Sequence, residues 1–78
     1  MKNLTGKWKN IQNEISTIAQ PQGSRLFTIS GRGITGPGAY TGPSTIVVHF
    51  QGGDLDGLVS PDGNKITWNN GDVYTRVG

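Results

Sequence analysis

The chain has 78 residues, of which 13 are glycine, and it carries one histidine, no cysteine and a formal net charge of +2 at pH 7. This composition excludes a disulfide framework and a thiolate metal site, argues against the usual zinc sites, and leads us to expect no metal or cofactor. So short a chain forms a small core, which predicts a single domain over residues 1–78 that gains stability by pairing with a second copy.

No segment is long and apolar enough for a signal peptide or a membrane span, so we expect no contact with a membrane. A mature secreted protein would show the same pattern. The sequence therefore leaves open whether the protein is cytoplasmic or secreted.

The first segment fits two structures. Its large apolar residues are spaced by four, three, four and three positions, the period of an amphipathic helix over residues 4–19: Leu4, Trp8, Ile11, Ile15 and Ile18. Against the helix stand Gly6 in its first turn and many isoleucine, threonine and asparagine residues, which are weak helix formers. The alternative is a hairpin of strands Leu4–Trp8 and Ile15–Ala19 with a polar turn at Gln12–Glu14, and we favour it.

The next expected strand covers residues 24–30, with Phe27 and Ile29 on one face. The segment Gly31–Gly36 that follows reads G-x-G-x-x-G, the spacing of a nucleotide-phosphate loop. Such a loop needs a helix directly after it, whereas residues 37–43 hold two prolines and two glycines. We therefore expect Gly31–Pro43 to be a long connection or a bulged, broken strand, with Tyr40 as its one large side chain.

From Ser44 onwards the sequence alternates as strands do. Ile46, Val48 and Phe50 fall on one face of the first strand, and His49 falls on the other. Two turns then set the pairing of the later strands. A four-residue loop over residues 61–64 sets Gly57 opposite Trp68, and a two-residue type I′ loop at residues 70–71 sets Trp68 opposite Val73.

This pairing predicts which side chains of the later strands point inward. One face collects the apolar residues, with the Trp68 indole over Gly57: Leu55, Val59, Ile66, Trp68 and Val73. The same register places Tyr74 on the outer face, between Lys65 and Arg76. An exposed aromatic ring flanked by cations could stack a sugar or a base.

The sequence argues against an enzyme. His49 lies on the outer face of its strand, no serine stands in a G-x-S-x-G motif, and one histidine leaves little from which to build a triad. Asp54, Asp56 and Asp62 lie in or near turns, where turn chemistry explains them.

The segment Leu4–Asn10, LTGKWKN, resembles the opening strand of the avidin and streptavidin barrels and the G-x-W signature of the lipocalins. Gly33–Gly36, with Tyr40 shortly after, is similar to the segment that follows in the avidins. The resemblance implies a calycin-like meander barrel in which Asn10 and Tyr40 contact a ligand's ureido oxygen. Glu14 stands where that family carries a serine, and we expect the chain to be too short for eight full strands.

The carboxyl end, residues 65–76, is similar to a strand–turn–strand ending of small uncharacterised β proteins, a likeness that implies a fold and no activity.

We predict an all-β antiparallel meander of six or seven strands, forming a barrel or a flattened sandwich. The leading functional hypothesis is a non-catalytic module that binds a small molecule or a glycan. Its candidate contacts are aromatic residues and one asparagine: Trp8, Asn10, Tyr40, Trp68 and Tyr74. The alternatives are a structural or protein-interaction domain that works as a homo-oligomer, and a weak binder of single-stranded nucleic acid, which is the less favoured of the two.

Overall fold

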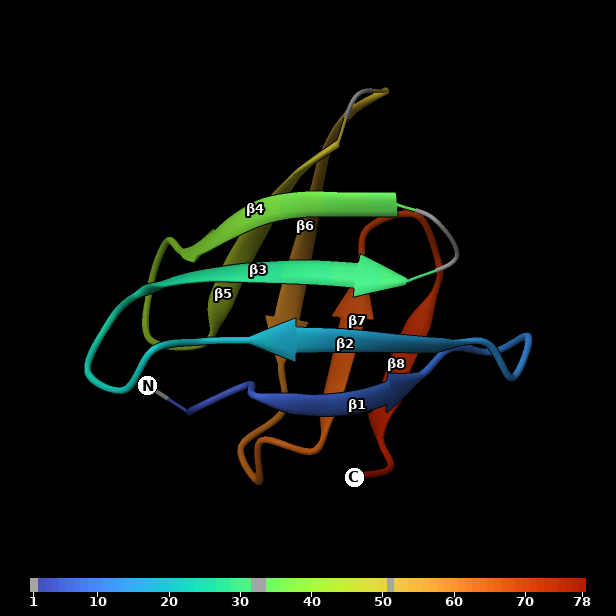
Figure 1. Cartoon of the computed structure of the whole chain (residues 1–78), viewed down its shortest axis with the longest axis horizontal. Coiled ribbons are helices and arrows are strands. Elements are labelled where there is room, and N and C mark those ends of the chain that lie inside the picture. Colours follow the sequence, from blue (N-terminus) through green and yellow to red (C-terminus); the bar gives the residue numbers. More distant parts are fainter. Residues whose placement is uncertain (1, 32–33, 51) are drawn as a thin grey trace.

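The computed structural model describes residues 2–31, 34–50 and 52–78, and within them eight antiparallel strands close into a barrel (Figure 1). Each strand pairs with its neighbours along the chain, and the last pairs with the first. The strands are β1 (Gly6–Lys9), β2 (Ile15–Ala19), β3 (Leu26–Gly31), β4 (Ile34–Tyr40), β5 (Thr45–Phe50), β6 (Gly53–Val59), β7 (Lys65–Trp68) and β8 (Val73–Arg76). The all-β meander barrel is confirmed, with eight short strands in place of six or seven.

Closure of the barrel bears on the expected pairing of two copies. Trp8 lies opposite Arg76, and Lys9 lies opposite Thr75, so β1 and β8 leave no free edge between them. Pairing through an exposed strand edge would need such an edge, whereas the small core of so short a chain remains a reason to expect a second copy. Among the residues whose burial is described, the exposed large apolar side chains lie on different elements: Ile11, Ile15, Leu26, Leu58 and Val77. A homo-oligomer therefore stays a prediction.

Residues 4–19 form the hairpin, and the helix alternative is wrong. No helix occurs among the described residues, so none of them could form a membrane-spanning one. In β1 and β2 alternate residues point inward, which buries Trp8 and Ile18 but leaves Ile11 67% and Ile15 43% exposed. The helical spacing arose because two strands and a turn happen to place apolar residues at those intervals.

The glycine-rich segment forms a strand. The prediction of a connection or a broken strand over Gly31–Pro43 is wrong, because β4 pairs with β3 without interruption from Leu26 opposite Ala39 to Gly31 opposite Ile34. Its pairing with β5 begins only at Gly38, directly after Pro37, which has no N–H to donate. Arg32 and Gly33 of the G-x-G-x-x-G motif lie outside the described residues.

Two glycines of β4 leave room for aromatic rings. A Cβ atom on Gly38 would lie 2.3 Å from Cε1 of Phe27, and one on Gly36 would lie 2.8 Å from the carbonyl oxygen of His49 and 3.1 Å from Cδ1 of Phe50. Because inward positions of a small barrel are filled by side chains, a large ring on one strand requires a small residue on its neighbour. Gly36 and Gly38 therefore serve packing.

The register of β6 with β7 is as predicted, and that of β7 with β8 is not. Gly57 lies opposite Trp68, and Ile46 and Val48 point inward. However, Ile66 pairs with Tyr74 rather than with Thr75, so Tyr74 is buried and Val73 is partly exposed.

The β7–β8 turn explains this shift. The N–H of Gly71 donates to the carbonyl of Trp68, and Gly71 has a φ of 92°, whereas neither asparagine before it has a positive φ. These are the features of a three-residue loop with a type I turn and a bulge at glycine, whereas a type I′ turn needs positive φ at both central residues. The extra residue turns every side chain of β8 to the other face.

One end of the barrel is closed by Arg76 and the chain before β1. The Arg76 guanidinium lies 4.5 Å from the centre of a Trp8 ring. It donates hydrogen bonds to the carbonyl oxygens of Asn3 and Thr5, each at 2.8 Å, and of Gly63 at 3.0 Å. Arg76 therefore ties the amino-terminal segment and the β6–β7 turn to the core.

Tyr40 closes the same end. Its hydroxyl donates to the carbonyl of Lys2, and its ring meets that of Phe27 edge to face, with the ring centres 6.5 Å apart. Burial raises the pKa of the Tyr40 phenol, while Arg76 and the hydrogen bond to Lys2 act in the opposite direction.

Stability is therefore expected to fall at alkaline pH. A pKa raised in the folded state means that the native protein holds the phenol proton more tightly than the unfolded chain. This contribution is complete below about pH 10, the ordinary value, and is lost as pH rises through the folded pKa. Urea unfolding at pH 8 and pH 11 measures the loss, and Tyr40→Phe should lose less stability between the two. An equal loss in both proteins would show that Tyr40 does not cause it.

A candidate ligand site at the open end of the barrel

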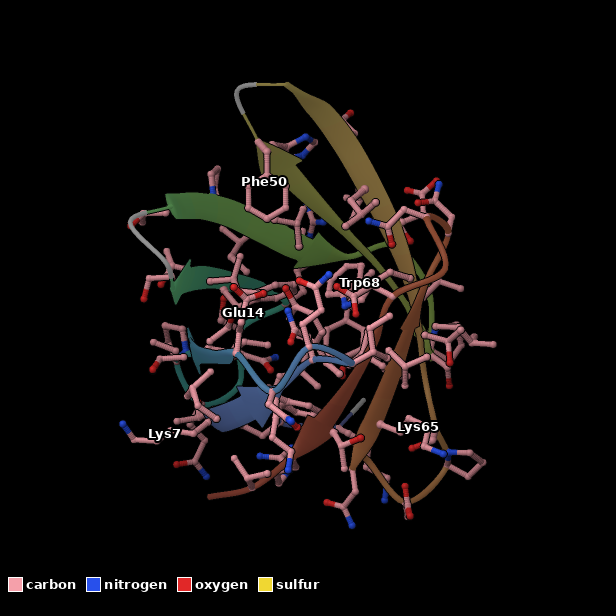
Figure 2. All side chains as sticks on the ribbon, turned by 90° about the vertical axis from the view of Figure 1, so that its right-hand side faces the viewer. Lys7, Glu14, Phe50, Lys65 and Trp68 are labelled. Carbon is pink, nitrogen blue, oxygen red and sulfur yellow. The ribbon has the colours of Figure 1, made fainter. Side chains whose placement is uncertain are left out.

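The other end of the barrel holds a hollow of about 670 Å³. It lies between the β5–β6 hairpin, the start of β2, the adjoining ends of β3 and β4, and the β7–β8 turn. The lining residues come from all of these elements: Ser16, Ile29, Ser30, Gly31, Thr35, Phe50, Gly52, Gly53, Asp54, Leu55, Asn70, Asp72 and Tyr74. Figure 2 shows the barrel from this side, with Phe50 near the hairpin tip and Glu14 across from it.

The β5–β6 hairpin forms the apolar wall of the hollow. Pairing of β5 with β4 ends at Val48, and pairing of β6 with β7 begins at Gly57. Beyond these residues the two strands of the hairpin pair with each other, and the Asn69 N–H also donates to the carbonyl of Asp56. This projecting part is visible at the top of Figure 1. Phe50 and Leu55 lie on its inner face, where both are partly buried against the core. They leave apolar surface open to the hollow.

The outer face of the same hairpin carries a pair of polar side chains in contact. His49 and Asp54 lie directly opposite each other, with Nδ1 and Oδ1 2.8 Å apart. Their side chains are 52% and 62% exposed, so the pair is solvated and adds little to stability. The Asp54 carboxylate is thus engaged on the side away from Phe50 and Leu55.

The facing wall carries Ser16 on β2 and Tyr74 on β8. Ser16 is only 5% exposed, yet its hydroxyl makes no hydrogen bond with the described residues. Gly31 makes room for that hydroxyl, because a Cβ atom there would lie 2.8 Å from Ser16 Oγ. Tyr74 packs edge to face on Trp68, with the ring centres 5.3 Å apart. This wall offers polar groups to a ligand.

Asp72 at the rim is held by the backbone. One carboxylate oxygen accepts hydrogen bonds from its neighbour Val73 N–H at 2.9 Å and from Ile11 N–H at 3.5 Å. Asn70 in turn accepts from the Asp72 N–H. The described residues contain no cluster of three or more histidine and acidic side chains that could hold a metal ion.

Three of the residues expected at a ligand site do not line this hollow. Trp8 is fully buried, and its indole N–H donates to the carbonyl of Leu4. Asn10 holds the β1–β2 turn, because its side-chain oxygen accepts from the N–H groups of Gln12 and Glu14. Tyr40 lies at the closed end. Their placement assigns these side chains to packing and turn formation.

Trp68 and Tyr74 are placed differently. Trp68 packs against Gly57 as expected and is 3% exposed, but its indole N–H is buried without a hydrogen-bond partner. It also lines a second hollow of about 510 Å³ over β5 to β7. Tyr74 lines the open end, and the prediction that it is exposed on the outer face is wrong. Because Arg76 is turned to the carbonyls of the closed end, the expected stacking platform of Tyr74 between Lys65 and Arg76 does not form.

Ser16, Leu55 and Asp72 line the hollow but were not among the contacts predicted from the sequence. The signal for Ser16 was present, since it shares the inward face of its strand with Ile18. The alternation pattern predicts that Phe50 and Leu55 point inward, but it does not indicate that they line an opening. Comparison of the chain with protein-family models, with curated proteins and with solved structures finds no match. The class that the fold defines is a closed, eight-stranded antiparallel meander barrel.

Proposed function

We propose that the protein is a non-catalytic binding module that takes a small molecule at the open end of its barrel. The observation that carries the proposal is a hollow of about 670 Å³ with an apolar wall on one side and polar groups on the other. Ligand sites typically have volumes of about 300 to 1,000 Å³, a mostly apolar lining and a few polar groups that orient the ligand. Phe50, Leu55, Ser16 and Tyr74 supply both kinds of surface.

Two further points support the proposal. The resemblance of residues 4–10 to the opening strand of the avidins and lipocalins agrees with a meander barrel that binds at its mouth. The groups that could act in catalysis are placed unfavourably, because His49 and Asp54 bond to each other on a solvent-exposed face of the hairpin and Asp72 is bonded to backbone N–H groups. A binding role needs no such chemistry.

Replacing Leu55 with glutamine tests this function. The probe is N-phenyl-1-naphthylamine, an uncharged molecule whose fluorescence rises in an apolar site. Leu55→Gln places a polar group in the apolar wall and should weaken probe binding about tenfold, roughly the effect of losing one buried apolar contact. The matched control is Leu58→Gln, three residues further along the same strand, where the side chain is 56% exposed.

Leu58→Gln should bind the probe as the parent protein does. Circular dichroism and urea unfolding establish that both variants are folded. Equal probe binding by the Leu55 variant, the Leu58 variant and the parent would refute the proposed site.

A further inference from the structure

We propose that the ligand of the open end is a neutral sugar, such as a hexose or an N-acetylhexosamine. The inference rests on the proposed function and adds the chemical class of the ligand. Three features of the described residues carry it: the charge of the lining, the arrangement of its two walls, and the hydroxyl of Ser16, which has no partner among these residues.

The charged groups of the lining disfavour an ionic ligand. The acidic residues among the described lining are Asp54 and Asp72, and no described lysine or arginine lines the hollow. An anion would therefore meet carboxylates with no described cation to pair with. A cation would have to compete for carboxylates that are already bonded, Asp54 to His49 and Asp72 to the N–H of Val73. An uncharged molecule is neither repelled by the carboxylates nor required to displace their existing partners.

The two walls match a ring that is apolar on one face and polar at its edge. In the closed strand order, β6 is four strands from β2, so Leu55 and Ser16 lie on opposite sides of the barrel. A pyranose ring presents C–H groups on its faces, which can pack on Phe50 and Leu55, and hydroxyl groups around its rim. These hydroxyls donate and accept, so they suit the Ser16 hydroxyl and the carboxylate of Asp72 together.

Ser16 is the specific contact. A serine hydroxyl that has no partner in the protein bonds to water or to a ligand group that displaces the water. Ser16 is 5% exposed, lines the hollow and has no partner among the described residues. The missing side chain of Gly31 keeps this hydroxyl accessible from the hollow. We assign it as a donor or acceptor for a sugar hydroxyl.

The test is a titration of the ¹⁵N-labelled protein followed by amide chemical shifts. Matched probes share one ring and differ in charge: N-acetylglucosamine is neutral, glucosamine is cationic and glucuronate is anionic. Glucose, galactose and mannose extend the neutral set, and N-phenyl-1-naphthylamine serves as the apolar probe. We expect neutral sugars to shift amides of residues 16, 31, 53–55 and 72, with the neutral ring binding at least fivefold more tightly than either charged ring.

Ser16→Ala should weaken binding of the neutral sugar about fivefold, the typical effect of one net hydrogen bond. Thr17→Ala is the matched control, because Thr17 is the next residue of β2 and points outward. It should leave sugar binding unchanged, and neither variant should alter the fold. Equal affinities of the two variants would remove Ser16 from the site and overturn the inference.

The outcomes separate the inference from the proposed function. If only the apolar probe shifts the amides at the open end, or if a charged ring binds more tightly than the neutral one, the sugar inference fails and the binding module stands. If no probe shifts these amides, both fail. Sugar-induced shifts confined to the second hollow near Thr41 and Thr67 would also overturn both assignments.

Discussion

Replacing Gly38 with alanine is expected to lower the free energy of unfolding by about 3 kcal/mol, the upper range for overpacking a filled core. The new Cβ atom would lie 2.3 Å from Cε1 and 2.5 Å from Cζ of Phe27, and the ring has little space to withdraw because Tyr40 packs on it. A core of this size supplies only about 3 to 5 kcal/mol in total, so the variant should be largely unfolded in mild urea. Urea unfolding followed by tryptophan fluorescence measures the change.

Two further variants show whether the clash is the cause. Gly52→Ala adds the same methyl group where no atom lies within 4 Å, and it should change stability by less than about 0.5 kcal/mol. Phe27→Leu combined with Gly38→Ala should be at least about 1 kcal/mol more stable than the sum of the single effects, because the smaller side chain relieves the contact. Strict additivity would mean that the ring and the glycine do not interact.

The sequence predicted the middle of the barrel well because the alternation there is unambiguous. In β5 the polar residues Thr45 and His49 share one face with Val47, so burying Ile46, Val48 and Phe50 is the assignment that leaves both polar side chains outside. The turn at residues 61–64 then set Gly57 opposite Trp68, as the structure confirms. A side-chain period of two leaves no intermediate arrangement, so a correct turn length gives a correct face.

The same period of two means that the wrong turn length placed every side chain of β8 on the wrong face. The stretch Asn69–Gly71 fits either a two-residue or a three-residue loop, and the two loops place Tyr74 on opposite faces. Local turn preferences do not decide between them. Inward placement of Tyr74 buries a large ring against Trp68, whereas the alternative would bury the smaller Val73. Packing across the closed barrel therefore selects the longer loop, and this information is not local.

The candidate site depended on closure even more strongly. Ser16, Leu55 and Tyr74 lie on β2, β6 and β8, and only the barrel brings these strands around one opening. Alternation marks their inward face but does not show which end of the barrel is open. The end that holds the hollow is open because the β5–β6 hairpin extends beyond the neighbouring strands, whereas the other end is filled by Arg76 and Tyr40. Strand lengths and end-filling side chains are set by tertiary packing.

Replacing Arg76 with alanine is expected to lower the free energy of unfolding by about 3 kcal/mol, since hydrogen bonds from a charged donor contribute about 1.5 to 3 kcal/mol. The carbonyl oxygens of Asn3, Thr5 and Gly63 lose their donor, and the Trp8 ring loses the guanidinium that covers it. Because the amino-terminal segment is tied down at these points, amide exchange should accelerate first at Leu4 and Thr5. Urea unfolding and hydrogen exchange measure both effects.

Two arginine variants distinguish the geometry of the guanidinium from its charge. Arg76→Lys keeps a cation near Trp8, but the lysine cannot reach three carbonyls at once. It should therefore recover less than half of the stability that Arg76→Ala loses. Arg25→Ala removes an equal charge from an exposed side chain whose contact with the Tyr40 carbonyl is 3.5 Å, and it should cost less than about 0.5 kcal/mol. If lysine restored full stability, the charge over Trp8 alone would hold the closed end, and the three carbonyl bonds would contribute nothing. We expect the hydrogen bonds of the guanidinium to supply most of the stabilisation. Only a planar group with several donors can join the amino-terminal segment, the β6–β7 turn and the Trp8 ring at one point.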